Sequence, residues 1–182
     1  MRASVIYVDV ASQKLLDKVE LTHPDFNTGH LALTDSGDLA VVSAPRDGLP
    51  NQEQQRGGVS LRPKGTAVRT MELPEEITRR MVGETLSVSI HQPSGIVAAT
   101  TPLGDVVTFW DIKKCKMVKS LDVARPRGVS LTLDGKYFVL THGEKIHDVL
   151  LISTDTLEIV PDSKIADSFI TGSHVITYPM PG

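Results

Sequence analysis

Three polar side chains at the predicted starts of inner strands have the chemistry of a ligand site, and a fourth can reach the same opening from its loop. The strand-start residues are His30, Arg127 and His174, and the loop residue is Glu84. Neutral imidazole is a common ligand for iron, copper or zinc, and the arginine fork binds carboxylate or phosphate groups. If the fold brings these side chains to one opening, His30 and His174 are the candidate metal ligands. Glu84 and Arg127 then complete a site for a metal or an anion.

The same positions also allow a purely structural role. Polar residues recur at strand starts because backbone groups there need hydrogen-bond partners, and Ser87 begins another repeat in the same way. On this alternative, which the recurrence favours, the side chains bond to loop carbonyls and line a wet channel. The ring nitrogens of His30 and His174 separate the two cases, because beyond about 7 Å one first-row metal cannot bind both.

Other reactive side chains form weaker patterns. The segment HGEKIHD (142–148) has a ligand-like composition, but its spacing matches no helical ligand pair, and a solvated loop is favoured. Cys115 stands between lysines in KKCK, where positive charge lowers a thiol pKa, although no nearby histidine supplies a base. The chain has no G-x-S-x-G elbow, P-loop, G-x-G-x-x-G or H-E-x-x-H motif. No catalytic residue is therefore assigned.

A repeated phrase of strand, turn and strand supplies the scaffold for these residues. It occurs as HLALTDSGDLAVVSAP, VSIHQPSGIVAATTP and GVSLTLDGKYFVLTHG. Alternation of apolar and polar residues around a tight turn is typical of paired strands. The matching glycines Gly37, Gly95 and Gly135 are 58 and 40 residues apart. Forty residues per four strands is the period of a propeller blade, and a long link and a short helix lengthen the first interval.

The sequence therefore predicts an all-β fold, a β-propeller of about four blades or part of a larger, seven-bladed type. One short helix is expected near 75–82, where Pro comes first and Gly last. The blades of this single domain, 1–182, are expected at about 30–72, 86–122 and 127–160, with a partial blade from 4–21 and 168–179. The two ends either complete one blade and close a small ring, or the chain is a piece of a larger propeller. A β-sandwich is less favoured, because the turn position repeats.

The long links fall on one predicted face of the propeller. They cover residues 22–29, 45–57, 73–86 and 161–172, whereas the turns on the other face are short. Function often resides on loops held by a rigid scaffold, so this long-loop face is predicted to bind a protein partner. The link over 45–58 is either a binding or lid loop or a disordered one. Phe109 or Trp110, in TFWDI, is expected to be buried between blades.

The composition excludes several classes of protein. The chain has 182 residues, a net charge of −3 and no cluster of Lys and Arg, which argues against binding nucleic acid. No apolar run is long enough to span a membrane. The single cysteine excludes an internal disulfide and a cysteine-built zinc site. The start, MRASVIYVDV, lacks the pattern of a signal peptide.

Several stretches carry a family resemblance. DVVTFWDIKKCKMVKSLDV followed by RPRGVSLTLDGKYFVLTHGE resembles the repeats of WD-repeat and YVTN-type bacterial propellers. Through GHLALTDSGDLAVVS, GIVAATTPLGDVVTFWDI and GSHVITYP, the whole chain resembles the C-terminal half of the bacterial family called domain of unknown function 1513. The resemblance implies an exported protein, roughly twice this length, encoded near imelysin-type iron-uptake proteins. It implies no catalytic residues.

Two functions follow as hypotheses. The favoured one is a non-catalytic scaffold or protein-interaction module, which the resemblance links to iron acquisition at the bacterial cell envelope. The alternative is a metal- or small-ligand-binding propeller, with enzymatic activity left open, whose site lies at the channel mouth. A periplasmic location follows from the resemblance, and a cytoplasmic one from the absence of an export signal. Open blade edges also predict a homodimer.

Overall fold

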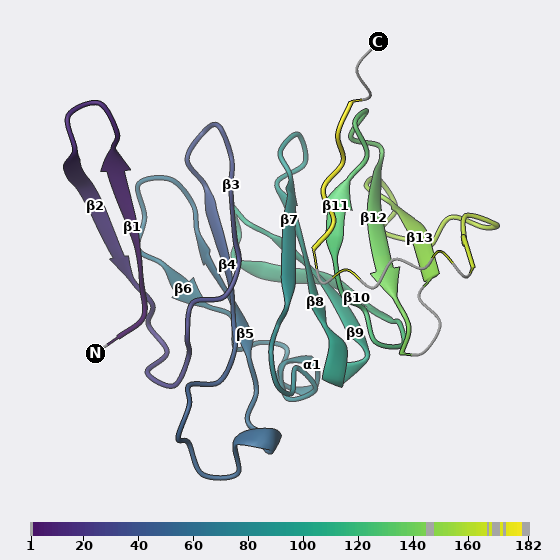
Figure 1. The fold of residues 1–182 in the computed structure, drawn as a ribbon, viewed down its shortest axis with the longest axis horizontal. Coiled ribbons are helices and arrows are strands. Elements are labelled where there is room, and N and C mark those ends of the chain that lie inside the picture. The colour runs from purple at the N-terminus through teal and green to yellow at the C-terminus, as the bar shows by residue number, and fades with distance from the viewer. Residues whose placement is uncertain (1, 145–147, 167, 169–171, 173, 180–182) are drawn as a thin grey trace.

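The computed structural model describes residues 2–144, 148–166, 168, 172 and 174–179. Within these residues the strands form four antiparallel sheets that follow one another in a row (Figure 1). The first sheet pairs β1 (Ser4–Asp9) with β2 (Lys14–Glu20). The second contains β3 (Leu31–Leu33), β4 (Leu39–Ser43), β5 (Gly58–Arg62) and β6 (Arg69–Thr70), in that order.

The other two sheets repeat this strand order. The third sheet contains β7 (Ser87–His91), β8 (Ile96–Thr101), β9 (Val106–Asp111) and β10 (Lys116–Asp122). The fourth contains β11 (Val129–Leu131), β12 (Tyr137–His142) and β13 (Asp148–Ser153). The expected helix forms as one turn, α1 (Glu75–Thr78). Short 3-10 turns lie at Gln52–Gln54 and Pro102–Gly104, and no described helix could cross a membrane.

The repeated turns form the hairpins between the first two strands of the second, third and fourth sheets. Gly37, Gly95 and Gly135 all have positive φ, at 93°, 69° and 70°. Residues with a Cβ rarely adopt this backbone conformation, whereas glycine does so without strain. The turns place β3, β7 and β11 beside one another as the innermost strands (Figure 1).

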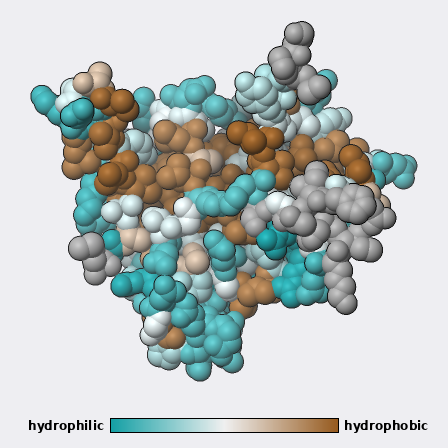
Figure 2. All heavy atoms as spheres, viewed as in Figure 1, coloured by the Kyte–Doolittle hydropathy of each residue, from teal (hydrophilic) through white to brown (hydrophobic). Residues whose placement is uncertain are grey.

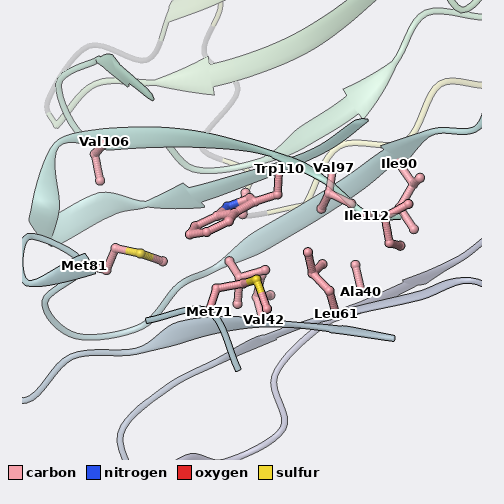
Figure 3. Close-up of a cluster of buried hydrophobic side chains, with 12 residues drawn as sticks. Ala40, Val42, Leu61, Met71, Met81, Ile90, Val97, Val106, Trp110 and Ile112 are labelled. Atoms are coloured by element: carbon pink, nitrogen blue, oxygen red, sulfur yellow. The ribbon is translucent and has the colours of Figure 1, made fainter. Parts of the chain in front are cut away.

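The core consists of apolar layers between successive sheets. Along β4, Leu39 and Val41 face β1 and β2, whereas Ala40 and Val42 face the third sheet. Along β9, Val106 and Trp110 face the second sheet, whereas Val107 and Phe109 face the fourth. This alternation is the two-residue period of a strand with both faces covered. Both Phe109 and Trp110 are buried, and Figure 3 shows Trp110 over Met71, Met81 and the side chains of the second sheet.

The outer edge of the fourth sheet is irregular. Residues 158–165 run along β13 through isolated bridges, Ile152 with Ile159 and Val149 with Ile165, rather than as a continuous strand. The Ser163 hydroxyl accepts a hydrogen bond from the Leu151 N–H at 3.1 Å and so replaces one backbone partner. The predicted fourth strand is therefore present only as backbone that follows the sheet edge.

The C-terminal residues lie against the innermost strand of the fourth sheet. Residues 174–179, for which an innermost strand is predicted, form no strand in this structure. The Thr177 hydroxyl donates to the Leu131 carbonyl at 2.7 Å. Val175 packs where Gly128 has no side chain, because a Cβ there would lie 2.8 Å from Val175 Cγ2. Figure 1 shows β1 and β2 at the opposite end of the row, and the fold is a partial β-propeller.

Candidate functional site

A hollow of about 480 Å³ opens at the starts of the innermost strands. Its walls come from the first residues of β3, β7 and β11 and from the C-terminal segment: Gly29, His30, Leu31, Ser87, Val88, Val129, His174 and Val175. Strand starts converge here because β3, β7 and β11 run side by side in the same direction (Figure 1). The structure thus places His30, Ser87 and His174 around one opening, which we call the axial hollow.

His30 and His174 are in direct contact across the axial hollow. Their ring centroids lie 4.1 Å apart with the planes tilted by 52°. Partial burial lowers the pKa of His30, the neighbouring His174 lowers this pKa further, and the charge of Glu84 opposes the shift. Glu84 lies at the same strand start, since a Cβ on Gly29 would be 4.0 Å from Glu84 Oε1. A neutral imidazole at His30 keeps a nitrogen lone pair available to a ligand.

Ser87 instead serves the backbone around it. Its N–H donates to Thr100 Oγ1 at 3.1 Å, and its hydroxyl accepts from the Val129 N–H at 3.1 Å. The Thr100 hydroxyl in turn donates to the Arg127 carbonyl at 2.5 Å. These bonds tie the start of β7 to the start of β11. Ser87 therefore has the structural role: its side chain satisfies backbone groups at a strand start.

Arg127 lies outside the axial hollow. The Arg127 N–H donates to the Thr141 carbonyl, and the Thr141 N–H donates to the Gly128 carbonyl. By this pattern Gly128, not Arg127, is equivalent to His30 and Ser87. A one-residue shift in register turns a side chain to the opposite face of a strand. Arg127 accordingly lines a separate hollow of about 280 Å³ with Arg125 and Glu144.

The metal chemistry of the axial hollow is limited to two imidazoles. Among the described residues, no group of three or more His, Cys, Asp or Glu side chains is arranged to hold a metal ion. His30 and His174 could supply two ligands of a tetrahedral site, with solvent or a bound group supplying the others. Their ring contact leaves the predicted pair of metal ligands sterically compatible with one ion.

The segment 142–148 does not gather its acidic groups into one site. Glu144 pairs with Arg125 at 3.4 Å, and Asp148 pairs with Lys164 at 2.7 Å. Burial lowers the pKa of His142, an effect that Asp148 opposes and Lys164 reinforces. His147 lies outside the described residues. Each described carboxylate therefore has its own cation.

A second hollow, which sequence reasoning missed, lies between the outermost strands of the second and third sheets. It has a volume of about 720 Å³ and is lined by residues 69–76 and 115–117. Met71 and Met117 both pack against the core between the two sheets, so thioether side chains form its floor. Leu73, at its rim, is 72% exposed. We call this hollow the rim groove.

Charged groups of both signs surround the rim groove. Arg69 and Lys116 lie on the two strands, Glu72 lies on the link to α1, and Glu75 and Glu76 begin α1. Glu72 pairs with Arg56, and Glu75 pairs with Arg79 at 2.5 Å. The available sequence signal was the methionine on the last strand of each of two adjacent repeats. The sequence alone does not show that these two methionines share a groove, because only the order of the sheets brings positions 71 and 117 together.

Cys115 lies in the wall of the rim groove, not on an open surface. Burial raises the pKa of its thiol, Arg69 lowers this pKa and Asp111 raises it, with a net shift upward. This corrects the sequence expectation, in which the flanking lysines lower the thiol pKa. The two lysines before Cys115 are paired with carboxylates: Lys114 with Asp111 at 2.9 Å, and Lys113 with Asp38 at 2.6 Å. A thiol with a raised pKa is a weak nucleophile at neutral pH.

Two of the long links are hydrogen-bonded to each other. The link over 45–57 crosses the link over 73–86, because the Gly57 N–H donates to the Met81 carbonyl and the Gly83 N–H to the Gln55 carbonyl. Only glycine fits at position 57, where a Cβ would lie 2.2 Å from the Ser43 carbonyl oxygen. The two links thus lie against each other, with Gly57 at their contact.

The row of stacked sheets, with its inner strands meeting at the axial hollow, defines a partial β-propeller. The chain belongs to the family described as "Protein of unknown function (DUF1513)", whose sequence model matches residues 1–166. It is similar to a chain of the solved structure "Crystal Structure of Mitotic Checkpoint Complex", with a TM-score of 0.59 and 11% identity. That match covers 87% of this chain and 43% of that chain, so this chain spans less than half of it. At this identity the likeness shows the fold alone, and curated proteins give no match.

Proposed function

We propose that the chain is a non-catalytic scaffold that binds a protein partner through the rim groove. The observation that carries the proposal is the groove itself, about 720 Å³ in volume, with a floor of Met71 and Met117 and a charged rim. An apolar centre within a polar rim is the anatomy of a protein-binding surface. Methionine side chains adapt to partners of different shape. The partner is expected to insert an apolar side chain flanked by charges.

The similarity to a solved structure supports an interaction role but names no partner for this chain. The similar chain comes from a structure of a protein complex, and in this proposal that supports an interaction role. We also propose that the chain is of the WD-repeat or YVTN-like subtype. The resemblance of the sequence to an exported bacterial family adds the periplasm and iron acquisition at the cell envelope as the proposed setting.

Selection from a displayed peptide library tests the groove with a defined probe. Selected peptides should share an apolar anchor and bind the chain. Replacing Met117 by lysine should raise their Kd about 30-fold, since losing a central anchor contact costs about 2 kcal/mol. The matched control is Val118→Lys, one residue along the same strand, where the side chain is 49% exposed on the surface.

The control variant should leave the Kd unchanged, and circular dichroism should show both variants folded. Peptides whose binding is insensitive to Met117→Lys, or equally sensitive to Val118→Lys, would contradict the proposed site.

A metal- or small-ligand site at the axial hollow is the second candidate, because His30 and His174 are in contact there. The metal content of natively purified protein tests it, with iron, copper and zinc measured together. One equivalent should be bound by the wild type and lost in the His30→Ala, His174→Ala double variant. His91→Ala is the control, because His91 bonds to Ser94 within its own turn. Absence of metal after purification and after titration would remove this candidate.

A further inference from the structure

Arg69 brings a positive charge to the rim groove that no described carboxylate neutralises. It lies on β6, two residues before Met71, and alternate residues of a strand share one face. Met71 packs into the core between the second and third sheets, so the Arg69 side chain extends toward the third sheet, where it lines the groove. That side chain is exposed and forms no ion pair or hydrogen bond with any residue that the structure describes.

An electrostatic effect across the groove supports this position of Arg69. Burial raises the pKa of the Cys115 thiol, and the charge of Arg69 opposes the rise. A charge has this effect only when it lies near the titrating group, and Cys115 stands in the turn before β10, in the third sheet. Asp111, which also acts on the thiol, is paired with Lys114 at 2.9 Å and so has its own cation.

The other charges of the rim groove divide between its two sides. Lys116, on β10, also lacks an ion pair within the described part of the chain. Two of the three glutamates pair with arginines, which leaves Glu76 on α1. The strand side of the groove is therefore positive, although the chain as a whole carries a net charge of −3. Figure 2 shows hydrophilic residues above and below a hydrophobic band rather than in one patch, so an acidic group is attracted by these local charges.

We propose that the partner of the rim groove is an acidic segment, with an Asp or Glu two residues from its apolar anchor in an extended chain. This inference rests on the proposed function and names the chemistry of the partner. The anchor fills the groove over Met71 and Met117, and the carboxylate meets the guanidinium fork of Arg69. Arg69 and Met71 are roughly 7 Å apart as alternate residues of a strand, which is also the spacing of alternate side chains in an extended peptide.

Peptides selected from the displayed library test the proposal by exchange of charges. They should share an acidic residue two positions from the apolar anchor. Replacing this residue by its amide should raise the Kd about fivefold, the size expected for one exposed ion pair. Arg69→Glu should raise the Kd of the acidic peptide roughly 20-fold, because an attraction becomes a repulsion. A peptide with lysine in place of the acid should bind Arg69→Glu more tightly than it binds the wild type.

Lys14→Glu is the matched control, since it makes the same change of charge at an exposed position of β2 in the first sheet. It should alter the Kd of neither peptide. Circular dichroism checks that Arg69→Glu is folded. If it is not, Arg69→Gln replaces it and should raise the Kd of the acidic peptide about fivefold.

The outcomes separate this inference from the proposed function. Peptides that depend on Met117 but bind equally well with the acid or its amide would overturn the inference alone. A lysine peptide that gains nothing from Arg69→Glu, or an equal loss of binding in Lys14→Glu, would overturn it in the same way. Peptides insensitive to Met117→Lys would contradict the proposed function itself, and this inference with it.

Discussion

Replacing Trp110 by alanine should lower the free energy of unfolding by about 3–5 kcal/mol, the usual cost of removing a buried tryptophan. Trp110 is fully buried between the second and third sheets, among Met71, Met81 and Val42 (Figure 3). Its Nε1–H donates to Thr108 Oγ1 at 2.9 Å, so the variant also leaves a buried hydroxyl with one partner fewer. Urea denaturation followed by circular dichroism measures the difference.

The control for this prediction is Val118→Ala in the neighbouring strand. Val118 is 49% exposed, so its truncation should change the free energy of unfolding by less than about 0.5 kcal/mol. If Trp110→Ala were as stable as the wild type, the packing of the second sheet on the third would be wrong.

Replacing Asp38 by asparagine should lower the free energy of unfolding by about 2–3 kcal/mol at pH 7, because a buried carboxylate loses its charge-assisted hydrogen bonds. Asp38 accepts hydrogen bonds from the Lys64 N–H at 2.8 Å, from Ser36 Oγ at 3.0 Å and from Lys113 Nζ at 2.6 Å. The Lys113 bond joins the turn of the second sheet to the third sheet. Asp35→Asn is the control and should have little effect, because the Asp35 side chain is exposed in the same turn.

The difference between wild type and Asp38→Asn should depend on pH. Burial alone raises the pKa of Asp38, but the bonds from Lys113, Lys64 and Ser36 outweigh burial and hold it below the usual 3.8. A carboxylate whose folded-state pKa is depressed stabilises the protein above its unfolded-state pKa. The difference should therefore be constant from pH 7 down to about 5 and shrink as the pH falls through 4 and below. A difference that stays constant at pH 3 would show that Asp38 contributes through its shape and not its charge.

Local pattern was sufficient to predict the hairpins of this fold. The turns at Gly37, Gly95 and Gly135 were predicted from glycine and polar neighbours, and all three have the positive φ that requires glycine. The strand pattern also predicted β4, β8, β9 and β12. Apolar layers cover both faces of β4, β8 and β9 and one face of β12. These turns and strands depend on residues that are close together in the sequence, so they can be predicted from a single sequence.

The sites depend on pairings that the sequence does not contain. The segment RGVSL allows either Arg127 or Gly128 to begin the inner strand, and only the hydrogen bonds of Thr141 decide for Gly128. The rim groove brings together residues 69–76 and 115–117, which are neighbours only through the order of two sheets. His30 and His174 were expected around one opening because the repeat marks both as strand starts, whereas their separation was left open. Their rings are in contact, although no strand forms at His174.

The two hollows support different chemistry within one scaffold. The axial hollow offers two imidazoles, and its backbone neighbours are satisfied by Ser87 and Thr100. The rim groove offers apolar volume between charged rims, without a nucleophile activated at neutral pH. The larger, apolar hollow is the one that a partner's side chain can fill. We therefore expect the protein partner to bind at the rim groove.

Alkylation of Cys115 tests that claim most directly. Cys115 is the only cysteine of the chain and lies in the wall of the rim groove. Its reaction with a maleimide at alkaline pH, where the thiolate forms, reports whether the groove is open. As a selected peptide is titrated to saturation, the rate should fall in proportion to the fraction of chains bound. A rate that stays unchanged at full occupancy would place the partner elsewhere and contradict the proposed function.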